Sequence, residues 1–190
     1  MSEKLFATML MVVAAVCSPL SAQPIINPQQ IWGDASDGVR MALSAAAATT
    51  SPGKAEFCLA FQNVGSEDAL LNLGIMVKGF QEPWAIRLIL TDPKGQPREL
   101  LYRTTRVWVR GRVDDLIVAL PSGGTYIIRI DLAQLSVYPK LELRPGRYQL
   151  AVRFEGKGPQ WLNLDTPGIG VWRFWKGTAQ SNSVEFEISE

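Results

Sequence analysis

The stretch Leu143–Glu155, LRPGRYQLAVRFE, decides the fold class of this chain. After its Pro-Gly corner, apolar residues occupy every second position: Tyr148, Leu150, Val152 and Phe154. This period of two predicts a half-buried β-strand, because successive side chains of a strand point to opposite faces. In immunoglobulin-like sandwiches a tyrosine near the start of a late strand bonds back to the preceding corner, and Tyr148 stands in such a place. An ordinary half-buried strand tyrosine is the alternative.

The same period of two recurs along the chain. It marks residues 39–44, 56–62, 86–91, 126–131 and 183–188. Turn sequences separate these runs, such as Asp92-Pro93-Lys94-Gly95, with proline second and glycine fourth. Seven to nine short strands over residues 31–190 predict an all-β fold, an antiparallel immunoglobulin-like β-sandwich. A flattened barrel or jelly roll is the second alternative.

The N-terminus has the pattern of an export signal. Lys4 precedes the apolar run LFATMLMVVAAV, which is shorter than the roughly 20 apolar residues that span a bilayer. We expect residues 1–22 to be a cleaved signal peptide, 23–30 a linker and 31–190 one domain, periplasmic or secreted, with no transmembrane segment in the mature chain. An uncleaved anchor, or a lipid anchor through Cys17, is the alternative.

Composition favours one globular domain. The 190 residues are 47% hydrophobic and 19% charged, and 19 basic against 18 acidic residues leave a net charge of +1. Such a balance creates no strong field toward nucleic acid, so we expect no nucleic-acid partner. Once the signal is removed, Cys58 is the one remaining cysteine, which predicts a chain without an intrachain disulfide. Its apolar neighbours predict a buried, inert thiol.

Four motifs carry a resemblance to a known group of domains: IWGDASDGVRMALS (31–44), FCLAFQNVGSEDALL (57–71), LILTDPKGQ (88–96) and WKGTAQSNSVEFEI (175–188). They resemble exported, uncharacterised bacterial immunoglobulin-like domains. A looser similarity links the chain to the immunoglobulin-like domain of bacterial intracellular proteinase inhibitors. The resemblance implies an immunoglobulin-like sandwich. It does not carry over protease inhibition, because the shared residues are turn and strand positions.

The sequence contains no histidine, which removes Ser-His and Cys-His nucleophile pairs and the commonest zinc ligand. We therefore predict a protein that is not an enzyme and that has no metal and no cofactor. A hydrolase acting on cell-wall polymers through two carboxylates is the less favoured alternative, since no spacing pairs two of them. The motif GDASDG (33–38) has two aspartates of a calcium loop but lacks the later glutamate, so we expect a turn there.

A basic segment supplies the candidate binding residues. If residues 106–110 of this segment form a strand, Arg106, Trp108 and Arg110 share one face, which cation–π stacking between them would hold together. This face would bind an anionic or carbohydrate partner or an envelope protein. Protection of an exposed strand edge is the alternative. We expect an exported, non-catalytic binding or interaction module of the bacterial envelope. A structural accessory domain of an envelope assembly is the second alternative.

The last stretch, residues 171–188, is predicted to be the closing hairpin of the sandwich. Alternation places Trp172 and Phe174 in the core and Trp175 at the turn, beside Gly177. Ser181 and Asn182 are expected to form a turn before the final strand, because such side chains bond to the nearby backbone.

Overall fold

The computed structural model describes residues 30–46, 55–77, 80–101, 113–132, 143–158 and 173–188. These ranges form eleven strands and no helix, so they hold none that is long and apolar enough to cross a membrane. The strands are β1 Val39–Ala45, β2 Glu56–Asn63, β3 Ala69–Val77, β4 Phe80–Glu82, β5 Ile86–Thr91, β6 Pro97–Leu101, β7 Val113–Leu120, β8 Thr125–Asp131, β9 Gly146–Gly156, β10 Gly177–Gln180 and β11 Val184–Ile188.

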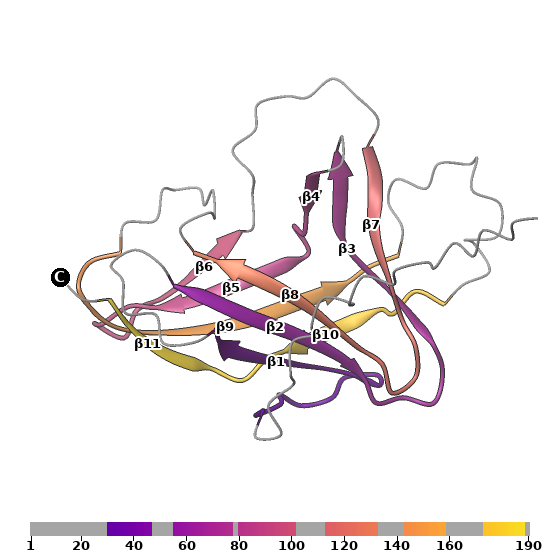
Figure 1. Cartoon of the computed structure of the whole chain (residues 1–190), viewed down its shortest axis with the longest axis horizontal. Coiled ribbons are helices and arrows are strands. Elements are labelled where there is room, and N and C mark those ends of the chain that lie inside the picture. Colours follow the sequence, from indigo (N-terminus) through magenta and orange to yellow (C-terminus); the bar gives the residue numbers. More distant parts are fainter. Residues whose placement is uncertain are drawn as a thin grey trace, which may run out of the picture.

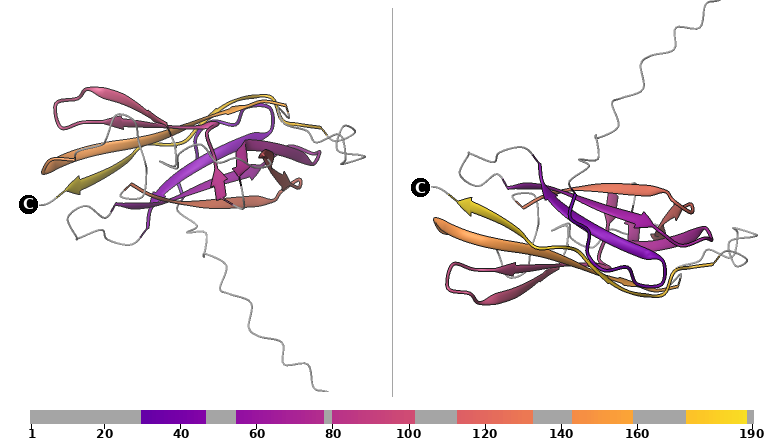
Figure 2. Two further views of the ribbon diagram at one scale, coloured as in Figure 1. Left: turned by 90° about the horizontal axis from the view of Figure 1, so that it is seen from above. Right: turned by 90° about the horizontal axis from the view of Figure 1, so that it is seen from below.

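The strands form three antiparallel sheets. One has the order β1-β2-β8, a second β6-β5-β9 with both β10 and β11 on the outer side of β9, and a third β4-β3-β7. Figure 2 shows the first two sheets as stacked layers, and β3 and β7 rise from one end of β2 and β8 in Figure 1. This arrangement confirms the predicted all-β sandwich.

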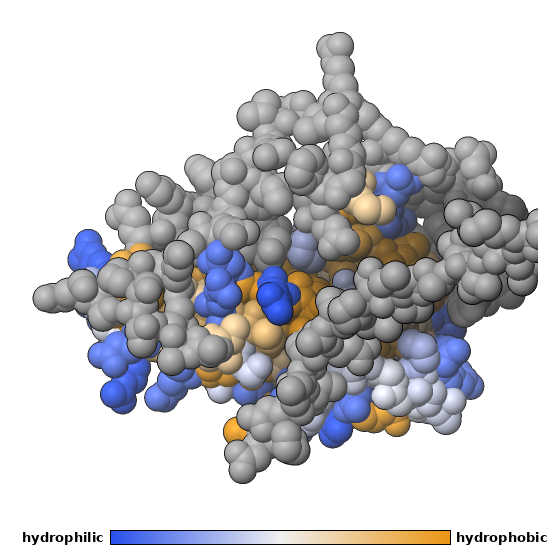
Figure 3. All heavy atoms as spheres, viewed as in Figure 1, coloured by the Kyte–Doolittle hydropathy of each residue, from blue (hydrophilic) through white to orange (hydrophobic). Residues whose placement is uncertain are grey.

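Aromatic contacts hold the two layers together. The ring of Phe61 on β2 meets Phe154 on β9 edge to face at 5.3 Å, and Phe57 meets Phe186 at 5.2 Å. Edge-to-face packing of this kind stabilises beyond the area that the rings bury. In Figure 3, hydrophobic residues show along the middle of the molecule and hydrophilic ones at its margins.

The period of two settles which side chains enter this core. On β5, Ile86, Leu88 and Leu90 are buried, and the residues between them are half-buried. The prediction that Cys58 is buried was wrong, because this free cysteine is half-buried. It alternates with Phe57 and Leu59, which point inward, and so it lies on the opposite face of β2.

The corner before β9 is a tyrosine corner. The Tyr148 hydroxyl accepts a hydrogen bond from the Arg144 backbone N–H at 3.0 Å and donates one to the Arg144 carbonyl at 2.9 Å. This bond back to the chain upstream is the one found in immunoglobulin-like sandwiches, so it confirms that interpretation of Tyr148 over an ordinary strand tyrosine. The turn at Asp92–Gly95 is confirmed too, since the Gly95 N–H donates to the Asp92 carbonyl at 2.9 Å.

The predicted closing hairpin was wrong. β10 and β11 do not pair with each other; both pair with β9, at 153–156 and 146–150, as successive segments of one interrupted strand. This interruption and the three-residue β4 bring the strands to eleven where seven to nine were predicted. Ser181 causes the break by bonding to Val152 in two ways: its N–H donates to the Val152 carbonyl, and its hydroxyl accepts from the Val152 N–H.

Asn182 uses the break to bind the other sheet. Its side-chain oxygen accepts from the Leu43 N–H at 2.7 Å, and its amide nitrogen donates to the Leu43 carbonyl at 2.9 Å. An asparagine amide offers one acceptor and two donors, so it replaces a neighbouring strand for one residue of β1. We call this contact the Asn182 latch. Of the two polar residues predicted to form a turn, Ser181 therefore bonds within its own sheet and Asn182 joins the two layers.

Candidate functional site

The predicted binding residues Arg106, Trp108 and Arg110 lie outside the described residues. They fall between the end of β6 at Leu101 and the start of β7 at Val113. Among the residues that the structure describes, a recess flanked by charged loops lies at the end of the sandwich where β2 ends and β3 begins.

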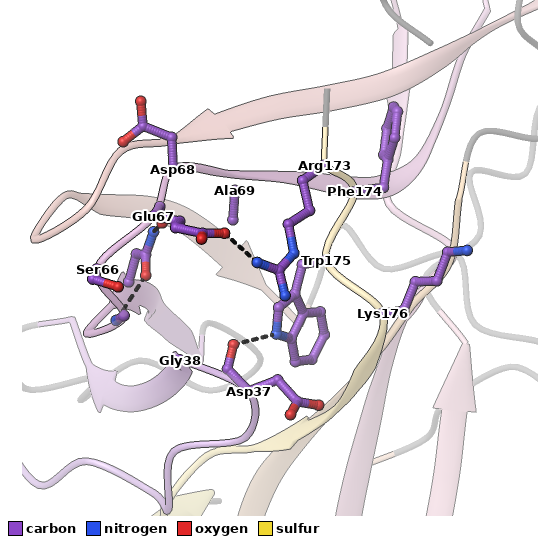
Figure 4. A pocket seen from close by; sticks show the side chains of 12 residues that line it. Asp37, Gly38, Ser66, Glu67, Asp68, Ala69, Arg173, Phe174, Trp175 and Lys176 are labelled. Atoms are coloured by element: carbon purple, nitrogen blue, oxygen red, sulfur yellow. Dashed lines mark hydrogen bonds and ion pairs between the residues drawn. The ribbon is translucent and has the colours of Figure 1, made fainter. Parts of the chain in front are cut away.

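This recess, which we call the loop-end depression, has a volume of about 530 Å³. Three stretches far apart in the sequence line it: residues 37–38, residues 63–69 and residues 173–176. Figure 4 shows side chains from all three converging on one hollow. The sequence predicted a turn at the first of these stretches, but it held no signal that the three stretches meet.

The first wall is a tight turn. Ser36 and Val39 exchange two backbone hydrogen bonds of 2.8 and 2.9 Å, with Asp37 and Gly38 between them at φ angles of 44° and 81°. Glycine and aspartate tolerate this left-handed region better than most residues. GDASDG therefore forms the turn that was predicted. Within the described ranges, no group of three or more His, Cys, Asp or Glu side chains is placed to hold a metal ion.

The second wall is fixed by Asn63, which is buried. Its amide nitrogen donates to the carbonyls of Glu67 and Leu120 at 2.8 and 3.0 Å, and its oxygen accepts from the Gly65 N–H at 2.9 Å. The Asp68 carboxylate accepts from the Ser122 N–H at 2.9 Å. These bonds tie the turn after β2 to the turn before β8, which makes the wall rigid.

Trp175 forms the floor and corrects a sequence prediction. It is buried and stacks on Phe154, with ring centres 5.4 Å apart and planes 14° from parallel, whereas Phe174 is half-buried. The prediction had placed Phe174 in the core and Trp175 at the turn; Trp172 lies outside the described residues. Strand alternation fails here because residues 173–175 make only an isolated parallel bridge to Leu70.

Two contacts of Trp175 explain its position. Its indole N–H donates to the carbonyls of Ser36 and Asp37, at 3.2 and 3.1 Å, so a polar edge reaches the first wall. A methyl group on Gly156 would lie 2.2 Å from its ring, and one on Gly177 would lie 2.9 Å from it. The two glycines thus make room for the ring, and the predicted contact with Gly177 is present.

Charges of both signs surround the floor. Arg173 and Glu67 form an exposed ion pair across the depression (Figure 4). Lys176 extends away from that pair, and neither it nor the Asp37 carboxylate has a side-chain hydrogen bond or ion pair with another described residue. A preformed hollow with unused charges at its rim can bind a polar, charged ligand.

Comparisons with known proteins do not assign this chain to a family. No protein-family profile matches the chain, and no curated protein sequence matches it. Among solved structures, a structural genomics target designated SoR45 is similar at 11% identity and a TM-score of 0.40, over 81% of this chain and 89% of that one. The GAE domain of yeast GGA1 is similar at 14% identity and a TM-score of 0.26, over 85% of this chain and 100% of that one.

Proposed function

We propose that this chain is an exported, non-catalytic interaction module of the bacterial envelope, built on an immunoglobulin-like sandwich. The tyrosine corner supports the immunoglobulin-like assignment. The apolar segment 5–16 supports export. Binding faces made of loops on a rigid sandwich are the usual way in which such folds recognise partners.

One observation carries the proposal: three loops distant in sequence form one braced, charged hollow. The buried residues Asn63 and Trp175 hold the walls by hydrogen bonds, so little conformational entropy is lost when a partner binds. The charges at the rim are exposed, and they would serve orientation and specificity more than raw affinity. The proposed partner is an envelope protein or a charged glycan. The face of Arg106, Trp108 and Arg110 stays a prediction for a second contact.

Site-specific photocrosslinking tests this function. A photoreactive amino acid replaces the exposed Ser66 in the depression, and a control carries it at the exposed Glu187 on β11. The purified proteins are irradiated in an envelope extract. We expect a discrete crosslinked product from position 66 and none from position 187.

Charge reversal then tests whether the depression itself makes the contact. Arg173→Glu breaks the ion pair with Glu67 and should abolish the product, and the swapped pair Glu67→Arg with Arg173→Glu should not restore it if the partner recognises the orientation of the charges. Equal products from positions 66 and 187, or a product that survives Arg173→Glu in a folded protein, would contradict the proposal.

A further inference from the structure

A second hollow, of about 570 Å³, lies at the other end of β9. It sits between the β5–β6 turn and the tyrosine corner. In Figure 1 the β5–β6 turn lies at the opposite end of the sheets from the turn after β2, which lines the loop-end depression. β9 has 11 residues, so at roughly 3.3 Å per residue the two hollows are on the order of 30 Å apart. One ligand of ordinary size cannot fill both. We call this one the corner hollow.

Both walls of the corner hollow are preformed. The Asp92 carboxylate accepts from the N–H groups of Lys94 and Gln96 at 2.9 and 2.8 Å, which fixes the β5–β6 turn. The opposite wall is the tyrosine corner. A methyl group on Gly146 would lie 2.7 Å from the Pro93 ring, so the two walls touch at their base. The hollow therefore needs no rearrangement to accept a ligand.

The lining combines an apolar floor with a cationic rim. Leu90 is 3% exposed and Tyr148 is 5% exposed at the floor, and the rings of three prolines lie in the walls. Lys94, Arg98 and Arg144 form the rim, and all three are exposed. The carboxylate in the lining, that of Asp92, is already used by the turn.

The three rim cations are unused within the described part of the chain. None of them forms a side-chain hydrogen bond or an ion pair with another described residue. By contrast, Arg87 and Arg153 on the neighbouring sheet surface both pair with Glu99. Uncompensated positive charge around an apolar floor makes a hollow complementary to an anion that also carries an apolar group.

We propose that the corner hollow binds an extended acidic segment of a partner polypeptide. Successive side chains of an extended chain point to opposite sides, so an apolar side chain can pack against the proline rings of the walls, above the buried Tyr148 and Leu90, while its acidic neighbours meet the rim. Arg98 and Arg144 each offer a fork of N–H groups that matches a carboxylate. A simple anion would interact only with the cations of the rim, and a neutral apolar peptide would interact only with the apolar lining. This site is independent of the loop-end depression.

Peptide binding by fluorescence polarisation tests the proposal. The probe is a fluorescein-labelled seven-residue peptide of alternating glutamate and leucine; the comparison peptides replace every glutamate by lysine or every leucine by serine. We expect the glutamate–leucine peptide to bind and the other two to bind at least about tenfold more weakly, since each loses one half of the complementarity. Equal binding of all three peptides would refute the proposal.

Two matched double variants locate the binding. Arg98→Glu with Arg144→Glu reverses two rim charges and should weaken binding at least about tenfold, while Arg173→Glu with Lys176→Glu makes the same change in net charge at the other end and should leave it unchanged. If the first variant fails to fold by circular dichroism, Arg98→Gln and Arg144→Gln singly serve, each expected to weaken binding several-fold. Equal losses in both double variants would overturn the assignment to this hollow.

Competition separates a peptide from other anions. Inorganic phosphate and vesicles with anionic lipid are titrated against the bound probe at the same ionic strength. We expect neither to displace the peptide at concentrations where the unlabelled peptide does. Full displacement by either at comparable concentration would replace the proposed peptide with a simple anion or a membrane surface.

Discussion

Tyr148→Phe should destabilise the sandwich by an amount set by two hydrogen bonds. The mutation removes one oxygen atom, which accepts from the Arg144 N–H and donates to the Arg144 carbonyl. The ring stays, including its stacking on Phe186 at 5.5 Å. A net hydrogen bond contributes about 1 kcal/mol, so two are worth about 2 kcal/mol. Because Arg144 is exposed and both bonds are only partly buried, we expect about 1–2 kcal/mol of lost unfolding free energy.

Tyr126→Phe is the matched control. Tyr126 is half-buried on β8, and its hydroxyl has no hydrogen bond to another described residue. Tyr126→Phe removes the same oxygen atom without breaking a hydrogen bond, so the unfolding free energy of this variant should change by less than about 0.5 kcal/mol. Urea unfolding of both variants is the measurement; the melting temperature of Tyr148→Phe should fall by about 3–6 °C. If the two variants differ by less than about 0.3 kcal/mol, the corner is not a stabilising contact and this reasoning is wrong.

Three further changes test the packing of the two layers by urea unfolding. Asn182→Ala leaves an N–H and a carbonyl of β1 without partners and should cost about 2–3 kcal/mol, whereas an unchanged midpoint would show that the latch is dispensable. Gly156→Ala forces a methyl group into the ring of Trp175 and should cost about 1–3 kcal/mol, while Gly158→Ala, with its nearest contact at 3.8 Å, should be close to neutral. Asn63→Ala removes three hydrogen bonds at a buried position and should cost about 3 kcal/mol; a loss below about 1 kcal/mol would contradict its role as a brace.

The sequence predicted those features that depend on local periodicity and turn chemistry. Alternation on β5 and β9 identified the buried side, and the Pro-Gly corner before Tyr148 indicated the tyrosine corner. Both follow from the backbone of an extended strand, which any sequence of that pattern shares. The fold class could therefore be predicted from the sequence.

The closing segment and the loop-end depression could not be predicted, because they depend on contacts far apart in sequence. Alternation assigned Trp175 to a turn, but the space that Gly156 leaves for its ring is visible only once β9 and β10 lie side by side. The sequence indicated a turn at Ser181 and Asn182 because such residues bond locally in most proteins. Here Ser181 bonds to Val152 and Asn182 bonds to Leu43, and both partners are distant in sequence.

The Asn182 latch also determines when, during folding, the edge of β1 stops being open to pairing with another chain. Leu43 and Asn182 are 139 positions apart, so the backbone of Leu43 lacks the Asn182 side chain as a partner until almost the whole chain has been synthesised. Closures over such sequence distances belong to slow-folding topologies, because loop entropy is lost before the contact forms. During that wait, the free N–H and carbonyl of Leu43 form a site at which a second chain can pair. A protein that loses the latch should therefore accumulate as aggregates formed during folding, even where its native state remains stable enough to persist.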